Sequence, residues 1–382
     1  MPTLDPKSQR GKTGDLLRLF LFFGLTAFGG PAAHLVSMQR ECVERRKWVS
    51  RERFLDLVGA CNLLPGPGST QVAMALGYSR AGWLGLLVAG ICFILPASLA
   101  TLGLAWAYVH FGNLAQMQGL LYGAKPVMVA IVGQAIWNLG RTAFRSRLLA
   151  LAGMACFAAA LAGVAPIVVL LASGGLVLLS ARFRSRQAAV QGFVSLSLGL
   201  GGASAGGSSL ASIFLVFLKL GVVVFGSGYV LLAFLKDDLV DRLHWVTLPQ
   251  LLDAVTAGQV TPGPVFATAT FLGFLVRGWA GAVLATVAIF LPSFFMAAAV
   301  GALAARIRSS PMAGAFLDGV NVAAVALMGW VALVLGRASL VDFWTTGMSL
   351  VSVVLLIRFR LNATWLILGG AALGILLKAI GA

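Results

Sequence analysis

The sequence predicts an all-α, polytopic membrane protein made of two homologous halves that are inverted relative to each other. The composition, the apolar runs and an internal repeat all point to this fold class. Of 382 residues, 59% are hydrophobic and only 10% are charged, and the mean hydropathy is +0.95. A soluble domain of this length needs far more charge to cover its surface. Apolar runs of about 18 residues recur along the chain, as expected for membrane-spanning helices.

The basic residues suit the same fold class. The formal net charge is +16, and much of it lies in short loops beside apolar runs, such as residues 40–53, 141–147 and 182–186. Positive loops of this kind orient helices in a membrane, so we expect the lipid bilayer as a partner and no nucleic acid. A modest preference for an anionic substrate is a second consequence of the positive charge.

No chemical constellation in the chain indicates an enzyme. The four cysteines lack metal-ligand spacing, and packing explains them. No Ser/His/Asp or Cys/His arrangement and no complete nucleotide-binding motif is visible. We therefore expect no catalysis, no metal and no cofactor, and any transport has to run on ion or solute gradients.

Matching motifs at one fixed spacing show a duplication. The first-half motifs recur 197 positions later, as position 65 does at 262. The pairs are Phe28-Gly29 with Phe225-Gly226, Trp48 with Trp245, Asp56 with Asp253, and Pro65-Gly66-Pro67 with Pro262-Gly263-Pro264. After a slip of one residue, Gly82-Trp83 matches Gly278-Trp279 and Leu95-Pro96 matches Leu291-Pro292. The predicted organisation is a tail (1–14), a first repeat (15–181), a basic then Gly/Ser-rich linker (182–211) and a second repeat (212–382).

Each repeat divides into similar apolar spans. In the first repeat they are residues 15–38, 82–110, 118–138, 146–161 and 164–181. In the second they are residues 212–235, 279–305, 315–335, 340–357 and 363–381. An odd number of crossings per repeat would invert the second repeat relative to the first, and we expect about 10 spanning helices in total. The basic N-terminus (Lys7, Arg10, Lys12) favours the cytoplasmic side, which this arrangement does not give. About 12–13 spans therefore remain an alternative.

A less hydrophobic segment separates the first two spans of each repeat and carries a Pro-Gly-Pro motif. These segments are residues 52–80 and 249–276. Because neither Pro nor Gly supports a continuous helix, we predict two half-helices that meet at a break, forming a re-entrant hairpin. Broken backbone is tolerated at membrane depth only where protein or a water-filled cavity surrounds it. The competing interpretation is that each motif merely ends a helix in a connecting loop.

The breaks are the predicted anion site. Proline favours the first position of a helix, so Pro67 and Pro264 would each begin a half-helix whose free N–H groups face the break. Helix N-termini bind anions, and inverted-repeat transporters hold substrate between such ends at the midplane. Amides lie three residues before each motif (Asn62, Gln259), and Lys125 lies in an apolar span. Hydroxyls follow only the first motif, so the site should be asymmetric.

The predicted residues fall into two groups. The substrate-binding candidates are Asn62, Pro65, Gly66, Pro67, Gly68, Ser69, Thr70, Lys125, Gln259, Pro262, Gly263, Pro264, Val265 and Phe266. The gating or coupling candidates are Gly29, Gly30, His34, Asp56, Gly226 and Asp253. Each has a competing structural interpretation. Lys125 could extend its amine to the headgroups, His34 could serve packing, and the two aspartates could form structural ion pairs.

Taken together, these motifs resemble the chromate ion transporter family in its long, two-domain form. The resemblance rests on Phe28-Gly29-Gly30-Pro31 with His34, on the tryptophan and aspartate pairs, and on the two Pro-Gly-Pro motifs. It covers nearly the whole chain. Gly68 departs from the family, whose members commonly carry asparagine there. The resemblance implies a secondary transporter in the bacterial inner membrane that exports chromate and confers chromate resistance, with sulfate as the related anion.

Two other functions remain open at this point. The chain could carry sulfate or another oxyanion, or it could be a channel or a structural membrane protein whose repeats serve packing only. The sequence also allows a homodimer. A catalytic function is the least favoured, for want of a catalytic set of residues.

Overall fold

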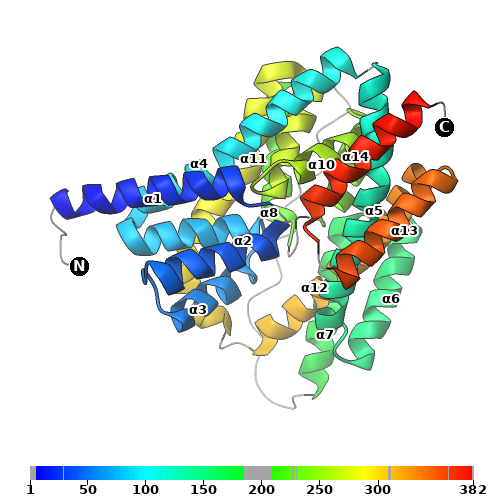
Figure 1. The fold of residues 1–382 in the computed structure, drawn as a ribbon. Helices are drawn as coiled ribbons and strands as arrows, with labels where there is room; N and C mark the ends of the chain where they lie inside the picture. Colours follow the sequence, from blue (N-terminus) through cyan, green and yellow to red (C-terminus); the bar gives the residue numbers. More distant parts are fainter. Residues whose placement is uncertain are drawn as a thin grey trace.

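The computed structural model describes residues 6–28, 30–112, 114–184, 209–225, 228, 230–308, 311–359 and 361–380. All regular elements in these residues are helices. The first half contains α1 (Pro6–Thr26), α2 (Gly30–Gln39), the π-helix η1 (Arg40–Arg45), α3 (Arg51–Cys61), α4 (Gly68–Phe111), α5 (Ala115–Ala143), α6 (Arg147–Leu161) and α7 (Pro166–Arg184). The two termini lie at opposite ends of the molecule (Figure 1).

The second half repeats the order of the first. It contains α8 (Leu210–Val223), α9 (Leu231–Leu235), the π-helix η2 (Lys236–Arg242), α10 (Leu248–Val260), the 3₁₀ turn η3 (Val265–Ala267), α11 (Thr268–Arg308), α12 (Pro311–Ser339), α13 (Phe343–Arg358) and α14 (Ala363–Ala379). Backbone details repeat as well, since Lys47 and His244 share φ values of 50° and 52°. The predicted linker lies mostly outside the described residues.

Four helical stretches of the described chain are long and apolar enough to cross a membrane. They are Gly68–Phe111, Gln116–Ala143, Val265–Val300 and Met312–Ser339. Shorter apolar helices surround them, including α6, α8, α13 and α14. This agrees with a polytopic all-α membrane protein, whereas the number of spans and the re-entrant hairpins stay predictions.

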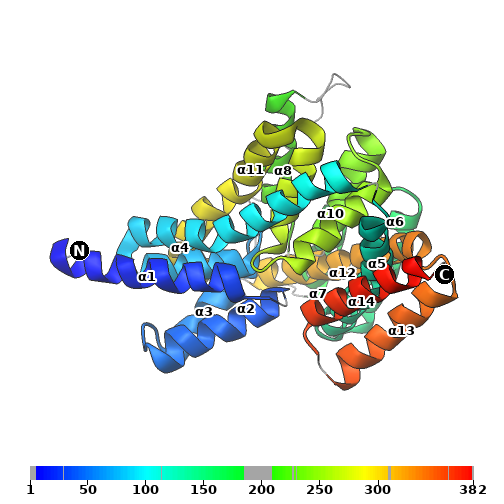
Figure 2. The ribbon, with the colours of Figure 1, turned by 45° about the horizontal axis from the view of Figure 1, so that its top comes forward.

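The first predicted span of each half is not a single helix. The span at 15–38 is divided into α1 and α2 by residues 27–29, and the span at 212–235 is divided between α8 and α9. Gly30 has a φ of 77°, and the ring of Pro31 removes a helical N–H, so a continuous helix cannot form. α1 runs to the middle of the molecule, and α2 turns back toward the same side (Figures 1 and 2). This reversal weakens the argument that put the basic N-terminus outside.

The half-helix after each Pro-Gly-Pro motif folds back on the long helix that follows it. α4 is non-helical at Gly82 (φ 60°), and α11 at Gly278 (φ 58°), where glycine tolerates the positive angle. Gly77 packs against Gly85 and Ala89 across the first reversal, which places the two segments antiparallel. The same packing recurs around Gly278. Each half-helix thereby forms a tight helical hairpin with the long helix that follows it.

The two halves interlock. α13 and α14 pack on α5 of the first half, while α6 and α7 pack on α12 of the second (Figure 1). Backbones touch where small residues meet, at Gly123 with Gly370 and at Gly319 with Gly174. Because each half offers the same surfaces to the other, a two-fold axis relates the two halves.

This interlock predicts a sharp difference between two glycines of α5. In Gly123→Leu the new side chain meets the carbonyl of Gly370, so we expect the free energy of unfolding to fall by about 3 kcal/mol or more. Gly133 has nothing within 4 Å of an added Cβ, so Gly133→Leu is the matched control. Unfolding of the purified proteins in detergent measures both. Equal stability of the two variants would show that the contact is not needed.

Candidate functional site

The two Pro-Gly-Pro breaks are joined to the opposite halves by backbone hydrogen bonds. The N–H of Gly66 donates to the carbonyl of Val224 at 2.6 Å, and the N–H of Gly263 donates to the carbonyl of Ala27 at 2.9 Å. The two bonds are equivalent, because both donors and both acceptors are 197 positions apart. Each break therefore rests on the interrupted first segment of the other half. Both glycines are buried, with φ values of 110° and 99°.

The half-helix after the first break exposes two backbone donors. Pro67 is the N-cap of α4, and its carbonyl accepts from the N–H groups of Thr70 (2.9 Å) and Gln71 (3.0 Å). The N–H groups of Gly68 and Ser69 have no partner among the described residues. They lie at the positive end of the helix dipole. After the second break, at the short turn η3, the N–H groups of Val265 and Phe266 likewise have no partner among the described residues.

Buried polar atoms without partners gather at the first break. A Cβ added to Gly66 would lie 2.7 Å from Nε2 of Gln71 and 3.0 Å from Oγ of Ser293. Nε2 of Gln71 donates to the carbonyl of Pro65 at 2.5 Å. Oε1 of Gln71, Oγ1 of Thr70 and Oγ of Ser293 have no partner in the described chain, although all three residues are fully buried. Buried polar groups are rarely left unpaired, so this cluster indicates a place for a polar ligand or water.

The second break is less polar. Where the first break has Ser293, the second has Ala97, whose Cβ lies 2.8 Å from a Cβ added to Gly263. Two polar atoms nearby in sequence lack partners in the described residues, Nε2 of Gln259 and Oγ of Ser98. The polar side chains described around the two breaks therefore differ.

His34 connects the two breaks. It is buried on α2, its Nε2 lies 3.0 Å from the carbonyl of Ala27, and its Nδ1 lies 3.2 Å from Oγ of Ser69. The ring of Phe93 contacts it edge-on. The carbonyl of Ala27 is also the acceptor for Gly263. One imidazole therefore touches the half-helix of its own half and, through a shared carbonyl, the break of the other half.

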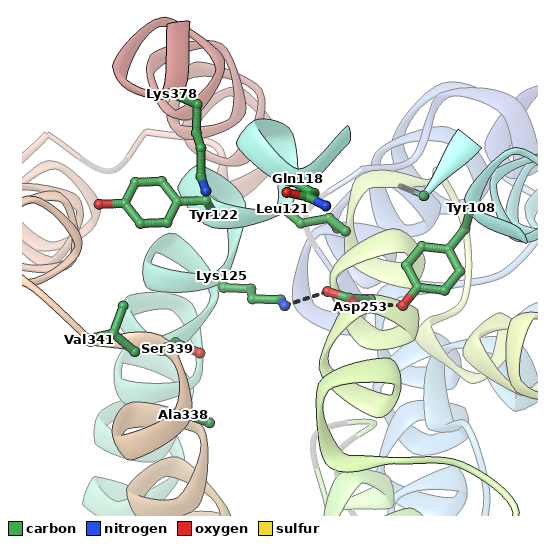
Figure 3. A pocket seen from close by; sticks show the side chains of 11 residues that line it. Tyr108, Gln118, Leu121, Tyr122, Lys125, Asp253, Ala338, Ser339, Val341 and Lys378 are labelled. Atoms are coloured by element: carbon green, nitrogen blue, oxygen red, sulfur yellow. Dashed lines mark hydrogen bonds and ion pairs between the residues drawn. The ribbon is translucent and has the colours of Figure 1, made fainter. Parts of the chain in front are cut away.

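Lys125 lies in a separate pocket of about 370 Å³ (Figure 3). Its Nζ lies 2.8 Å from Oδ1 of Asp253 on α10, and the hydroxyl of Tyr108 donates to Oδ2 of Asp253 at 3.0 Å. Gln118, Tyr122 and Lys378 also line the pocket. Asp253 precedes Pro262 by nine residues, about 13 Å along a helix, so the lysine and the break do not share one site.

The remaining predicted residues lie in different places. Asn62 is exposed at the C-cap of α3, with its Oδ1 3.4 Å from a Cβ added to Gly68. Asp56 is half-buried on α3, and Gly30 begins α2. Gly29 and Gly226 lie outside the described residues.

When the chain is compared with known protein families, one family matches each of the two halves. The family described as "Chromate transporter" matches residues 14–178 and again residues 211–375. The chain belongs to the chromate transporter family. An inverted repeat fits these two matches, and the protein is a multi-pass membrane transporter.

Curated relatives extend over most of this chromate transporter. It is 32% identical to the "Chromate transport protein" of Cupriavidus metallidurans, over 94% of this chain and 91% of the relative. It is 33% identical to the "Probable chromate transport protein" of Synechococcus elongatus, over 89% of this chain and 88% of the relative. An uncharacterized transporter of Bacillus subtilis, YwrA, is 31% identical over 33% of this chain and 70% of its own length. No solved structure matches the chain.

Sequence reasoning missed two residues of the first break, Gln71 and Ser293. Gln71 follows Thr70 in the first turn of the half-helix and is itself a polar residue in an apolar stretch, which is a usable signal. Ser293 follows Leu291-Pro292 of the other half, and nothing local connects it with Gly66. Only the packing of α11 on the first break brings it there.

The ion pair of the pocket can be tested by a double-mutant cycle. Lys125→Met leaves the buried carboxylate of Asp253 without its cation, so we expect it to destabilise the protein by about 3 kcal/mol. Adding Asp253→Asn should recover most of that loss, because the uncompensated charge is gone. Lys378→Met, an exposed residue of the same pocket, is the control. Thermal unfolding in detergent is the measurement, and additive effects of the two changes would contradict the coupling.

Proposed function

We propose that the protein is a secondary transporter that binds chromate at the first Pro-Gly-Pro break and exports it across the bacterial cytoplasmic membrane, giving chromate resistance. The observation that carries this proposal is a pair of buried hydroxyls without partners in the described residues: that of Thr70 in the first turn of the half-helix, and that of Ser293 beside Gly66 of the break. The names of the relatives in Cupriavidus metallidurans and Synechococcus elongatus support chromate as the substrate.

The donors at this break suit a tetrahedral dianion. Moving such an ion through lipid without partners would cost tens of kcal/mol. Two backbone N–H groups, two hydroxyls and a helix dipole can replace its hydration shell. None of these donors carries a full charge, so the anion is not held too tightly for release.

The arrangement of the halves suits alternating access. The break of each half rests on the other half, so rocking of one half against the other would open the site to either side in turn.

Sulfate is the second candidate substrate. The donors at the break recognise charge and tetrahedral geometry, which chromate and sulfate share. The site offers no described group that would distinguish strongly between the two ions, so selectivity has to come from size and hydration.

Transport into proteoliposomes tests the proposal with chromate and sulfate in turn. In the double variant Thr70→Val, Ser293→Ala we expect chromate transport to fall at least about tenfold, since hydrogen bonds to a charged ligand contribute roughly 1.5–3 kcal/mol each. Ser352→Ala is the matched control, because this buried hydroxyl donates to the carbonyl of Met348 on its own helix, α13. Unchanged chromate transport in the double variant would reject the break as the binding site.

A further inference from the structure

We propose that His34 takes up a proton when the oxyanion binds at the first break. The inference rests on the proposed function, because it assumes an oxyanion at the first break. It goes further by giving a buried imidazole a defined step in the transport cycle.

The hydrogen bonds of His34 fix its neutral tautomer. The carbonyl of Ala27 can only accept, so Nε2, at 3.0 Å, must carry the hydrogen of the neutral ring. Nδ1 is then the acceptor, and the hydroxyl of Ser69 donates to it over 3.2 Å. In this state the only proton of the Ser69 hydroxyl points at the histidine and not at the break.

Protonation of the ring reverses the second hydrogen bond. A proton taken from water onto Nδ1 turns this nitrogen into a donor, and Oγ of Ser69 becomes its acceptor. The hydroxyl hydrogen of Ser69 is then free to donate to an anion beside the half-helix. The break gains one donor and a nearby positive charge in a single step, and both are lost when the proton returns to water.

The surroundings of His34 make this proton dependent on the anion. α2 carries no charged residue, α1 has none after Arg18, and the α4 half-helix has none before Arg80. The neighbouring η1 carries Arg40, Glu41, Glu44 and Arg45, of which Glu41 and Arg45 are paired with each other. The long part of α4 offers only the thiol of Cys92 before Tyr108, and the second-half segment from Pro262 has no titratable group before Arg277. A lone imidazolium in such a place is costly, and so is a lone dianion. Each therefore stabilises the other, and the two ions should bind together.

The duplication supports a specialised role for His34. The equivalent position of the second half is Leu231, which is buried and apolar. A residue needed only to pack the fold would be served by an apolar side chain at both positions. The first break has the histidine, the hydroxyls and the unpartnered atoms, so the chemistry of proton and anion gathers in one half.

Two measurements on the purified protein test the inference. Chromate is added in weakly buffered alkaline solution, where it is a dianion, and a pH indicator records protons taken up. Binding of radiolabelled chromate is measured from about pH 8 to about pH 5.5. For the unmodified protein we expect about one proton per bound chromate and at least a fivefold gain in affinity as the pH falls. Because the proton binds with the anion, low pH must strengthen binding.

His34→Gln and His34→Asn keep a polar side chain but cannot titrate, so both should lose the proton uptake and the extra gain in affinity. The exposed histidines provide controls, and His110→Gln and His244→Gln should behave like the unmodified protein. Chromate binding without proton uptake, or uptake that persists in both His34 variants, would overturn the inference. Absence of chromate binding to the unmodified protein at every pH would instead reject the proposed function.

Discussion

Two equivalent backbone hydrogen bonds join the halves at the Pro-Gly-Pro breaks, from Gly66 to Val224 and from Gly263 to Ala27. A broken helix inside a membrane leaves N–H and carbonyl groups that must find partners. Here the break of each half donates to the interrupted first segment of the other half, so each half supplies backbone partners to the other. The interlock of α5 with α14 and of α12 with α7 has the same reciprocal form. The contacts between the two halves are therefore reciprocal throughout the described structure.

The symmetric frame carries an asymmetric set of side chains. Thr70 and Ser293 have Ala267 and Ala97 as their counterparts, and His34 has Leu231. The Lys125–Asp253 pair also lacks a counterpart, since the equivalent residues are Asn321 and Asp56. Gene duplication supplies two identical backbones, and the polar chemistry then needs to be kept at only one of them. The second break, whose neighbour Ala97 is apolar, would then contribute mainly backbone contacts between the halves.

The sequence predicts local features well and long-range ones poorly. Hydropathy places α5 to α7, α12 to α14 and the long parts of α4 and α11 within a few residues, because each carries its own apolar run. Proline and glycine mark the breaks, since their backbone chemistry is local. No local signal reports that Ser293 lies against Gly66, or that Lys125 faces Asp253 across more than a hundred residues. Lys125 belonged to the predicted anion site for its charge, yet packing gives it an acidic partner in a different pocket.

The absence of a charged side chain among the described contacts of the first break determines how the site can work. A fixed arginine would bind a dianion tightly and hold it, whereas neutral donors bind it weakly and release it. A proton on His34 would add positive charge only while the substrate is present and remove it afterwards. The histidine reaches this role through geometry. The carbonyl of Ala27 orients the ring, and the hydroxyl of Ser69 links the ring to the half-helix at the break. The same Ala27 carbonyl also accepts from the N–H of Gly263 in the opposite half. Under this proposal, occupancy of the site and the contact between the halves would both involve the carbonyl of Ala27, which accepts from His34 and from Gly263.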